Sequence, residues 1–329
     1  MSEYQAIKGV KVKTASSDPA NINLGDVWYN TTTNTFKARI YSSGWASGNN
    51  ILTPAGPGIR QNGAGGGGGS SCFFFGGYRD DAPYTWTNTQ NFDGTSWSNS
   101  GEYPWSWQGN GGTGASQSTG IGFCGYQRPG YPPIGNKAGS ATYNGTSWTA
   151  VNDMPTTSGG ARGTGTDSLA LAWALADGPA TRVCAWDGTC WTNTVDQVSG
   201  GPSCAKGYSG TKTSAFMAGT PSTGSETWND TCWSASGTVT ACNNGGTAGA
   251  SNSDGLVWGG NTNQNDTSSF DGTSWSAKGN LVIASGDYGG AAGISNTAAW
   301  SSGGTPKPTA GLATQLYTEG GATQTITTS

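Results

Sequence analysis

The sequence predicts an all-β protein built as a six-bladed β-propeller with a short N-terminal β extension. Two observations carry this prediction. The hairpin motif FDGTSW at 92–97 recurs in five related copies, and successive Trp residues are separated by 52, 51, 43, 42 and 42 positions. These six residues are Trp45, Trp97, Trp148, Trp191, Trp233 and Trp275. Repeats of this length are typical of propeller blades, each of which supplies four strands.

Each copy of the motif has the composition of a tight hairpin. The copies are FDGTSW at 92–97 and 270–275, YNGTSW at 143–148, WDGTCW at 186–191 and WNDTCW at 228–233. Asn-Gly and Asp-Gly accept positive φ at both centres of a type I′ turn. This predicts a two-residue turn in which Tyr143 faces Thr146 and Ala141 faces Trp148, so that Tyr143 lies diagonal to Trp148. The six Trp residues are then expected to be structural, buried between neighbouring blades.

A second landmark runs in phase with the hairpins and supplies the second strand of each blade. It is a short apolar run ending in small residues, found as FFFGG at 73–77, GFCG at 122–125, LALAWA at 169–174, AFMAG at 215–219, GLVWGG at 255–260 and TAAWSS at 297–302. The segments upstream are rich in Gly, Ala and Ser. They suit an innermost strand, because strands converge at a propeller axis and leave little room for side chains.

The two ends of the chain are irregular. The run at 297–302 has no Trp hairpin after it, while Trp45 precedes the first run. Ring closure by a strand at 36–47 would complete the sixth blade and protect open edges. In the alternative, GATQTITTS at 321–329 forms that strand and Trp45 belongs to a separate hairpin. We expect residues 1–35 to be an extension that makes the assembly contact and residues 36–329 to be the propeller.

Composition excludes several function classes. A net charge of -4 without a basic run argues against nucleic-acid binding. The sequence predicts no signal peptide and no membrane insertion, because it has neither an N-terminal apolar region nor a run of about 18 apolar residues. With no His, and seven Cys without a CxxC pair, we expect no metal, no cofactor and no catalytic residues.

The apolar strand ending in a glycine pair, followed by an aromatic residue and Trp, resembles the kelch repeat. It is more similar still to kelch-like repeats in virion proteins of tailed bacteriophages of the marine type, over residues 45 to about 322. The segment GDVWYNTTTNTFKARIYSSGW at 25–45 is similar to a hairpin unit of phage tail and fibre proteins. The resemblance implies a non-enzymatic structural protein of the virion, made in the host cytoplasm, in a tail, fibre or capsid appendage. Its implied partners are other virion proteins and a host-surface glycan.

The alternative is a carbohydrate-active enzyme, a glycosidase or sialidase-like propeller, or a free lectin. Sialidase-type propellers carry an Asp box at a similar turn, but that motif separates its Asp from its Gly by one residue. Here Asp93, Asp187 and Asp271 each adjoin a Gly. Two carboxylates at the propeller axis would favour catalysis, whereas an axis lined by Gly, Ala and Ser would favour a binding protein.

Two enlarged blades predict a recognition rim. The inserts YRDDAPYTWTN at 78–88 and YQRPGYPPIGNKAG at 126–139 are expected to flank GEYPWSWQGN at 101–110. They would gather Tyr84, Trp86, Tyr103, Trp105, Trp107 and Tyr131 with Arg79, Asp80, Asp81 and Arg128. Aromatic faces with a few polar groups suit stacking on sugars or anchoring a protein partner. In a second interpretation, these rings pack on one another and only hold the long loops in place.

Overall fold

The structure of the chain is a computed structural model. It describes residues 12–52, 63–77, 86–127, 133–173, 182–198, 207–219, 224–239, 245–260, 264–285, 290–303 and 313–326. All regular elements within these ranges are β-strands, which form six sheets. The described ranges hold no helix long and apolar enough to cross a membrane.

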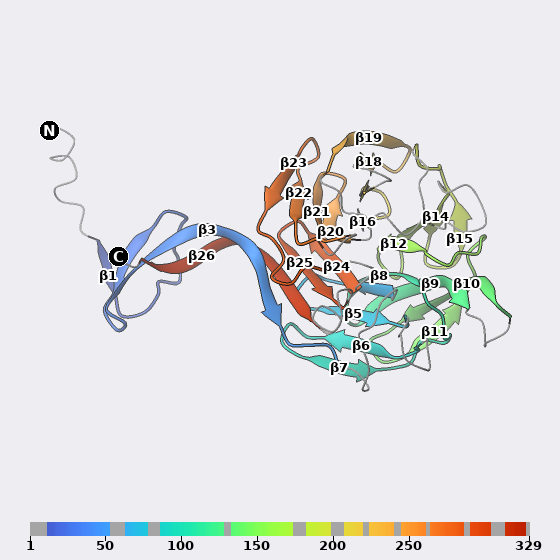
Figure 1. Cartoon of the computed structure of the whole chain (residues 1–329), viewed down its shortest axis with the longest axis horizontal. Helices are drawn as coiled ribbons and strands as arrows, with labels where there is room; N and C mark the ends of the chain where they lie inside the picture. Colours follow the sequence, from blue (N-terminus) through green and yellow to red (C-terminus); the bar gives the residue numbers. More distant parts are fainter. Residues whose placement is uncertain are drawn as a thin grey trace. The chain divides into compact units, whose positions relative to one another are not determined.

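Five of the six sheets have four antiparallel strands each, taken in order along the chain (Figure 1). The first contains β4 (Gly63–Gly66), β5 (Cys72–Phe75), β6 (Thr89–Phe92) and β7 (Trp97–Ser100). The second contains β8 (Gly111–Ser116), β9 (Thr119–Gln127), β10 (Gly135–Tyr143) and β11 (Trp148–Val151). The third contains β12 (Arg162–Gly165), β13 (Ala170–Trp173), β14 (Val183–Trp186) and β15 (Trp191–Asn193).

The fourth and fifth sheets repeat this pattern. The fourth contains β16 (Gly207–Gly210), β17 (Ala215–Ala218), β18 (Gly224–Trp228) and β19 (Trp233–Thr238). The fifth contains β20 (Gly246–Ser251), β21 (Asp254–Trp258), β22 (Thr267–Phe270) and β23 (Trp275–Lys278). In all five sheets the apolar run predicted as a second strand is the second strand, and the motif Trp begins the fourth.

The sixth sheet joins the two ends of the chain. Its order is β24 (Gly290–Ser295), β25 (Ala298–Ser302), β26 (Thr314–Ile326), β3 (Thr35–Gly48), β2 (Val27–Asn30) and β1 (Lys13–Ala15). An added side chain at Gly48 would meet Thr314, and one at Gly321 would meet Arg39, so β3 and β26 run in opposite directions. The sheet is mixed, because β1 pairs with β2 in parallel.

The first strands of the six sheets form a complete circle. They contact one another in the order β4, β8, β12, β16, β20 and β24, and β24 contacts β4 again. Figure 1 shows these strands near the centre and the fourth strands β7, β11, β15, β19 and β23 at the periphery. The arrangement is consistent with a six-bladed propeller.

The chain divides into two compact units. Unit 1 is Met1–Ser43 with Glu319–Ser329, and unit 2 is Gly44–Thr318. Both β3 and β26 contribute one end to each unit. Within unit 2, Trp45 contacts Trp258 and Tyr317, with ring centroids 4.9 and 5.3 Å away. The outermost strand of the sixth sheet in unit 2 is therefore the end of β3 that carries Trp45.

The predicted hairpin register is wrong. Tyr143 pairs directly with Trp148, and Ala141 with Ala150 rather than with Trp148. The reason is the side chain of Asn144, whose Oδ1 accepts the backbone N–H groups of Thr146 and Ser147 at 3.0 and 2.8 Å. This Asx turn widens the loop to four residues between the paired rings, and only its Gly has positive φ.

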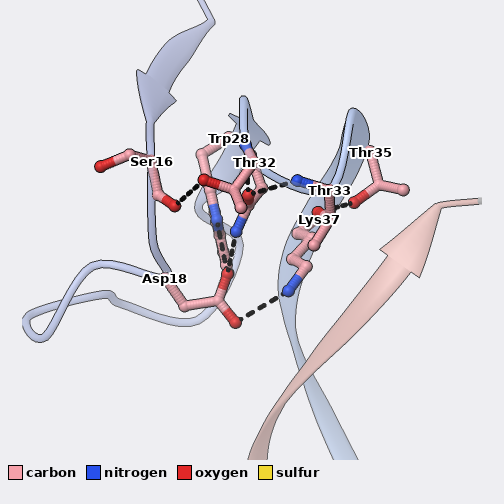
Figure 2. Close-up of polar contacts among 8 residues, drawn as sticks. Ser16, Asp18, Trp28, Thr32, Thr33, Thr35 and Lys37 are labelled. Atoms are coloured by element: carbon pink, nitrogen blue, oxygen red, sulfur yellow. Dashed lines mark hydrogen bonds and ion pairs between the residues drawn. The ribbon is translucent and has the colours of Figure 1, made fainter.

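Unit 1 is organised around Asp18 (Figure 2). One carboxylate oxygen accepts bonds from the Trp28 indole at 3.2 Å and the Asn30 amide at 3.1 Å, and the other pairs with Lys37 at 2.9 Å. These bonds, that to Lys37 above all, lower the pKa of the Asp18 carboxyl. They tie the segment before β2 to one face of the β2–β3 hairpin, where Trp28 is buried.

Candidate functional site

A cavity of about 370 Å³ lies among the first strands of unit 2. Its walls come from all six of these strands and from the turns that follow β12 and β16. The lining residues are mostly Gly, Ala, Ser and Thr, joined by Leu169, Tyr208 and Lys212. Small residues are required because neighbouring backbone lies close. A Cβ at Gly114, for example, would lie 2.3 Å from the carbonyl oxygen of Thr119.

Several hydroxyl groups of the cavity wall bond to neighbouring sheets. Thr113 donates to the carbonyl of Gly165, and Thr164 donates to that of Gly210, both at 2.7 Å. Thr247 of the fifth sheet donates to the carbonyl of Tyr208 in the fourth at 2.9 Å. These hydroxyls therefore link adjacent first strands, which gives them a structural role.

Ionisable groups are scarce at this cavity. Among the described residues that line it, Lys212 is the one charged side chain, and no carboxylate is present. Paired carboxylates for glycoside hydrolysis are thus not among these lining residues. Elsewhere, burial raises the pKa of Cys72 and of Cys124, and raises that of Cys184 to about 11. These three thiols stay protonated at neutral pH and are poor nucleophiles.

The structure reveals a contact between sheets that the sequence reasoning missed. The indole N–H of Trp97 donates to the Thr314 hydroxyl at 2.8 Å, from the first sheet to the sixth. The same bond joins Trp148 to Thr89, Trp191 to Ser140, Trp275 to Ser225 and Trp45 to Thr267. In every case the acceptor belongs to the third strand of the preceding sheet, so this bond fixes neighbouring sheets to each other.

A sequence signal for this contact exists. The residue eight positions before each motif Trp is Thr89, Ser140, Val183, Ser225 or Thr267. Val183 is the exception, and it is the residue expected to face Trp233. The Trp233 indole nitrogen is buried without a hydrogen-bond partner, and its ring packs in one cluster with Val183. The indole hydrogen bond therefore recurs at five of the six contacts between neighbouring sheets and is missing at Trp233.

Trp45 and the five motif Trp residues differ in burial. Trp45, Trp97, Trp191 and Trp233 are buried, while Trp148 and Trp275 are half-buried. Trp148 nevertheless contacts several rings at once. Its centroid lies 4.5 Å from that of Phe75 and 4.8 Å from that of Tyr143.

The predicted rim is described in part. Trp86, Tyr103 and Trp107 are buried, and Trp105 is half-buried. Trp105 stacks on Trp107 with parallel rings 4.6 Å apart, and Tyr103 meets the Trp105 ring edge-on at 5.3 Å. Trp107 also donates to Gln127 at 2.9 Å. The segment 103–107 therefore holds its three rings together, and of the four described rim aromatics only Trp105 keeps substantial exposure.

The remaining rim residues lie outside the described part of the chain. They are Arg79, Asp80, Asp81, Tyr84, Arg128 and Tyr131. A recognition role for the rim stays a prediction, and Trp105 is the described residue on which it can be tested. Likewise, the described residues contain no group of three or more side chains suited to hold a metal ion.

Comparison with known proteins gives no match for this chain. No protein-family model matches the chain, and no curated protein matches it. Functional assignment therefore depends on the geometry above and on the resemblance of the repeats.

Proposed function

We propose that the chain is a non-enzymatic structural and recognition protein of a bacteriophage particle, built as a six-bladed kelch-like β-propeller with an N-terminal β extension. The observation that carries the non-enzymatic part is the axial cavity. Its described wall offers small side chains, hydroxyls bonded between sheets, and one Lys. Such a wall suits a scaffold, whereas general acid–base catalysis needs titratable groups converging on a pocket.

The virion setting is supported by the resemblance of the repeats and of residues 25–45 to phage proteins. In this proposal the protein is made in the host cytoplasm and is incorporated into the particle with other virion proteins. Unit 1 makes the attachment and the propeller carries the recognition surface. Removing residues 1–24 tests the attachment, because it deletes β1 and Asp18, which bonds to Trp28, Asn30 and Lys37. Particles that keep the shortened chain at full occupancy would place the attachment elsewhere.

The recognition surface that we propose is the rim around Trp105, with a host-surface glycan or a neighbouring virion protein as ligand. One face of the Trp105 indole is covered by Trp107, so the ring is held rigidly while part of it stays accessible. A rigid, half-exposed indole is a low-entropy platform for a sugar ring or an apolar side chain.

The test is a pair of variants at one position. Trp105→Ala should abolish binding of the purified chain to host cells or immobilised host polysaccharide, or its incorporation into particles. Trp105→Phe should keep most of the function, because it preserves an aromatic face. Trp107 is left unchanged, because its ring is buried and its indole donates to Gln127, so we expect its removal to destabilise the fold. A folded Trp105→Ala protein that is unchanged in both assays would show that the rim is only structural.

A further inference from the structure

The turn that begins at Asn144 holds a side-chain amide in an activated setting. Asn144 is exposed, and the next residue, Gly145, has a φ of 95° and no side chain that would shield its backbone nitrogen. Oδ1 of Asn144 accepts the backbone N–H groups of Thr146 and Ser147 at 3.0 and 2.8 Å, and their hydroxyls at 3.0 and 3.3 Å. Four donors therefore converge on a single carbonyl oxygen.

These donors stabilise the charge that develops when a nucleophile attacks the amide carbon of Asn144. The backbone nitrogen of Gly145 can attack this carbon, Cγ, because the attack closes a five-membered ring. Oδ1 then carries negative charge in a tetrahedral intermediate, and preformed N–H donors at about 2.7–3.1 Å from such an oxygen lower the barrier to its formation. Both backbone N–H bonds at Asn144 fall in this range.

The product of such an attack, an aspartate, is already encoded at the same place in three other turns. These turns begin at Asp93, Asp187 and Asp271, and Oδ1 of each accepts the N–H groups two and three residues further on at 2.7–2.9 Å. These bonds favour the carboxylate, since they lower the pKa of each of the three Asp side chains. An aspartate at position 144 therefore fits the turn without rearrangement.

We propose that Asn144 is a site of spontaneous deamidation in the folded protein. The Gly145 nitrogen gives up its proton and bonds to Cγ of Asn144, the bond from Cγ to the amide nitrogen breaks, and ammonia leaves with that proton. Water then adds at Cγ and opens the succinimide ring, which leaves an aspartate in the normal backbone. The reaction consumes one water, releases one ammonia and adds one negative charge to the second sheet, with no change in oxidation state.

Opening of the ring at its other carbonyl gives isoaspartate, which lengthens the main chain by one carbon. The direct pairing of Tyr143 with Trp148 across a four-residue loop leaves no place for that carbon, so the fold favours aspartate. This inference does not rest on the proposed function, because it uses only the turn and its hydrogen bonds.

Two other asparagines each lack one part of the arrangement at Asn144. Oδ1 of Asn229 accepts the N–H groups two and three residues further on at 3.1 and 3.0 Å, but the next residue is Asp230, whose charged side chain hinders its backbone nitrogen. Asn110 is followed by Gly111, yet Asn110 is fully buried and its Oδ1 has no hydrogen-bond partner among the described residues. These two positions are internal controls.

Peptide mapping by mass spectrometry of the full chain, incubated folded in mildly alkaline, isotope-labelled water, is the first measurement. Label at position 144 marks conversion during the incubation, and the variant Asn144→Asp provides the reference for aspartate against isoaspartate. Asn144 should convert at least about tenfold faster than Asn229 and Asn110, because each of these lacks either a glycine nucleophile or the preformed donors. The product should be mainly aspartate.

The variant Asp230→Gly supplies the missing glycine to the turn that begins at Asn229. Asp230 has a φ of 74°, which Gly adopts without strain, so the variant is expected to fold. Conversion of Asn229 should then rise at least about tenfold, toward the rate of Asn144.

Two results on the unaltered chain overturn the inference, whether or not the variant folds. One is an Asn144 that stays intact in the folded protein while it converts in the same chain unfolded by urea, because the turn then protects the amide. The other is a product that is mainly isoaspartate. An unchanged rate at Asn229 in folded Asp230→Gly protein also contradicts it, because the donors and a glycine are then not sufficient.

Discussion

Replacing Val183 by Thr, which adds one hydroxyl, is predicted to make the protein more stable. Val183 lies on the third strand of its sheet. At the corresponding position, the other five sheets have a Ser or Thr, which accepts an indole N–H from the next sheet at 2.8–3.1 Å. The Trp233 indole nitrogen is buried and unpaired beside Val183. Val183→Thr should supply the missing acceptor with little change in side-chain volume.

The magnitude follows from the cost of an unpaired donor. A buried unsatisfied N–H costs roughly 1–3 kcal/mol, and burying the new hydroxyl offsets part of the gain. We expect Val183→Thr to raise the free energy of unfolding by about 1 kcal/mol. The reverse change, Thr314→Val, leaves the equally buried Trp97 without its acceptor and should lower that free energy by about 1–3 kcal/mol.

Urea denaturation followed by Trp fluorescence measures both variants under the same conditions. The slope of the transition should be unchanged, so that the shift in midpoint reports stability. Adding Trp233→Phe tests the cause, because a ring without N–H should remove the benefit of Val183→Thr. The reasoning is refuted if Val183→Thr destabilises the protein while Thr314→Val is neutral, or if the benefit survives in the Trp233→Phe background.

Two further predictions concern other described side chains. Bonds from the backbone N–H groups of their own loops lower the pKa of Asp93, Asp187 and Asp271. Their contribution to stability is present above the unfolded pKa of about 3.9 and is lost as pH falls through the folded values. Changing all three to Asn should flatten the dependence of the urea midpoint on pH in that acid range, with little effect at pH 7, because Asn144 and Asn229 make the same turn bonds. Among the five described cysteines of native protein, a thiol reagent should modify Cys232 first and Cys190 more slowly, while Cys72, Cys124 and Cys184 react only after unfolding. Peptide mapping would show this order, and early labelling of Cys124 would contradict its burial.

Much of the fold follows from features that repeat. The apolar runs and the motif Trp mark the second and fourth strands, because each sheet must bury the same kinds of side chain against its neighbours. The hairpin register does not follow from the dipeptide rule. Asn144 and Asp93 cap their own loops with a side-chain oxygen, and this local bond competes with the two-residue turn that Asn-Gly and Asp-Gly suggest.

The candidate sites, too, could be predicted from the sequence only in part. Small residues at the axis could be predicted, because strands converge there. A Ser or Thr acceptor lies eight positions before four of the five hairpin Trp residues, but only the structure shows that it binds the Trp of the next sheet. Aromatic composition alone identified Tyr103, Trp105 and Trp107 without showing which are covered. Burial depends on how the segment folds back on itself, here through the stacking of Trp105 on Trp107.

The most direct test of the account is whether Gly44–Gly48, near the start of the chain, is the strand beside Thr314–Thr318. A Cβ at Gly48 would lie 3.3 Å from the Thr314 side chain, which is compatible with a disulfide. In Gly48→Cys, Thr314→Cys protein, oxidation and peptide mapping should give a cross-link between these two positions within one monomer. The control pair Gly48→Cys, Thr149→Cys should give none. If the first pair stays unlinked in folded monomer, the ring is not closed by the N-terminal strand.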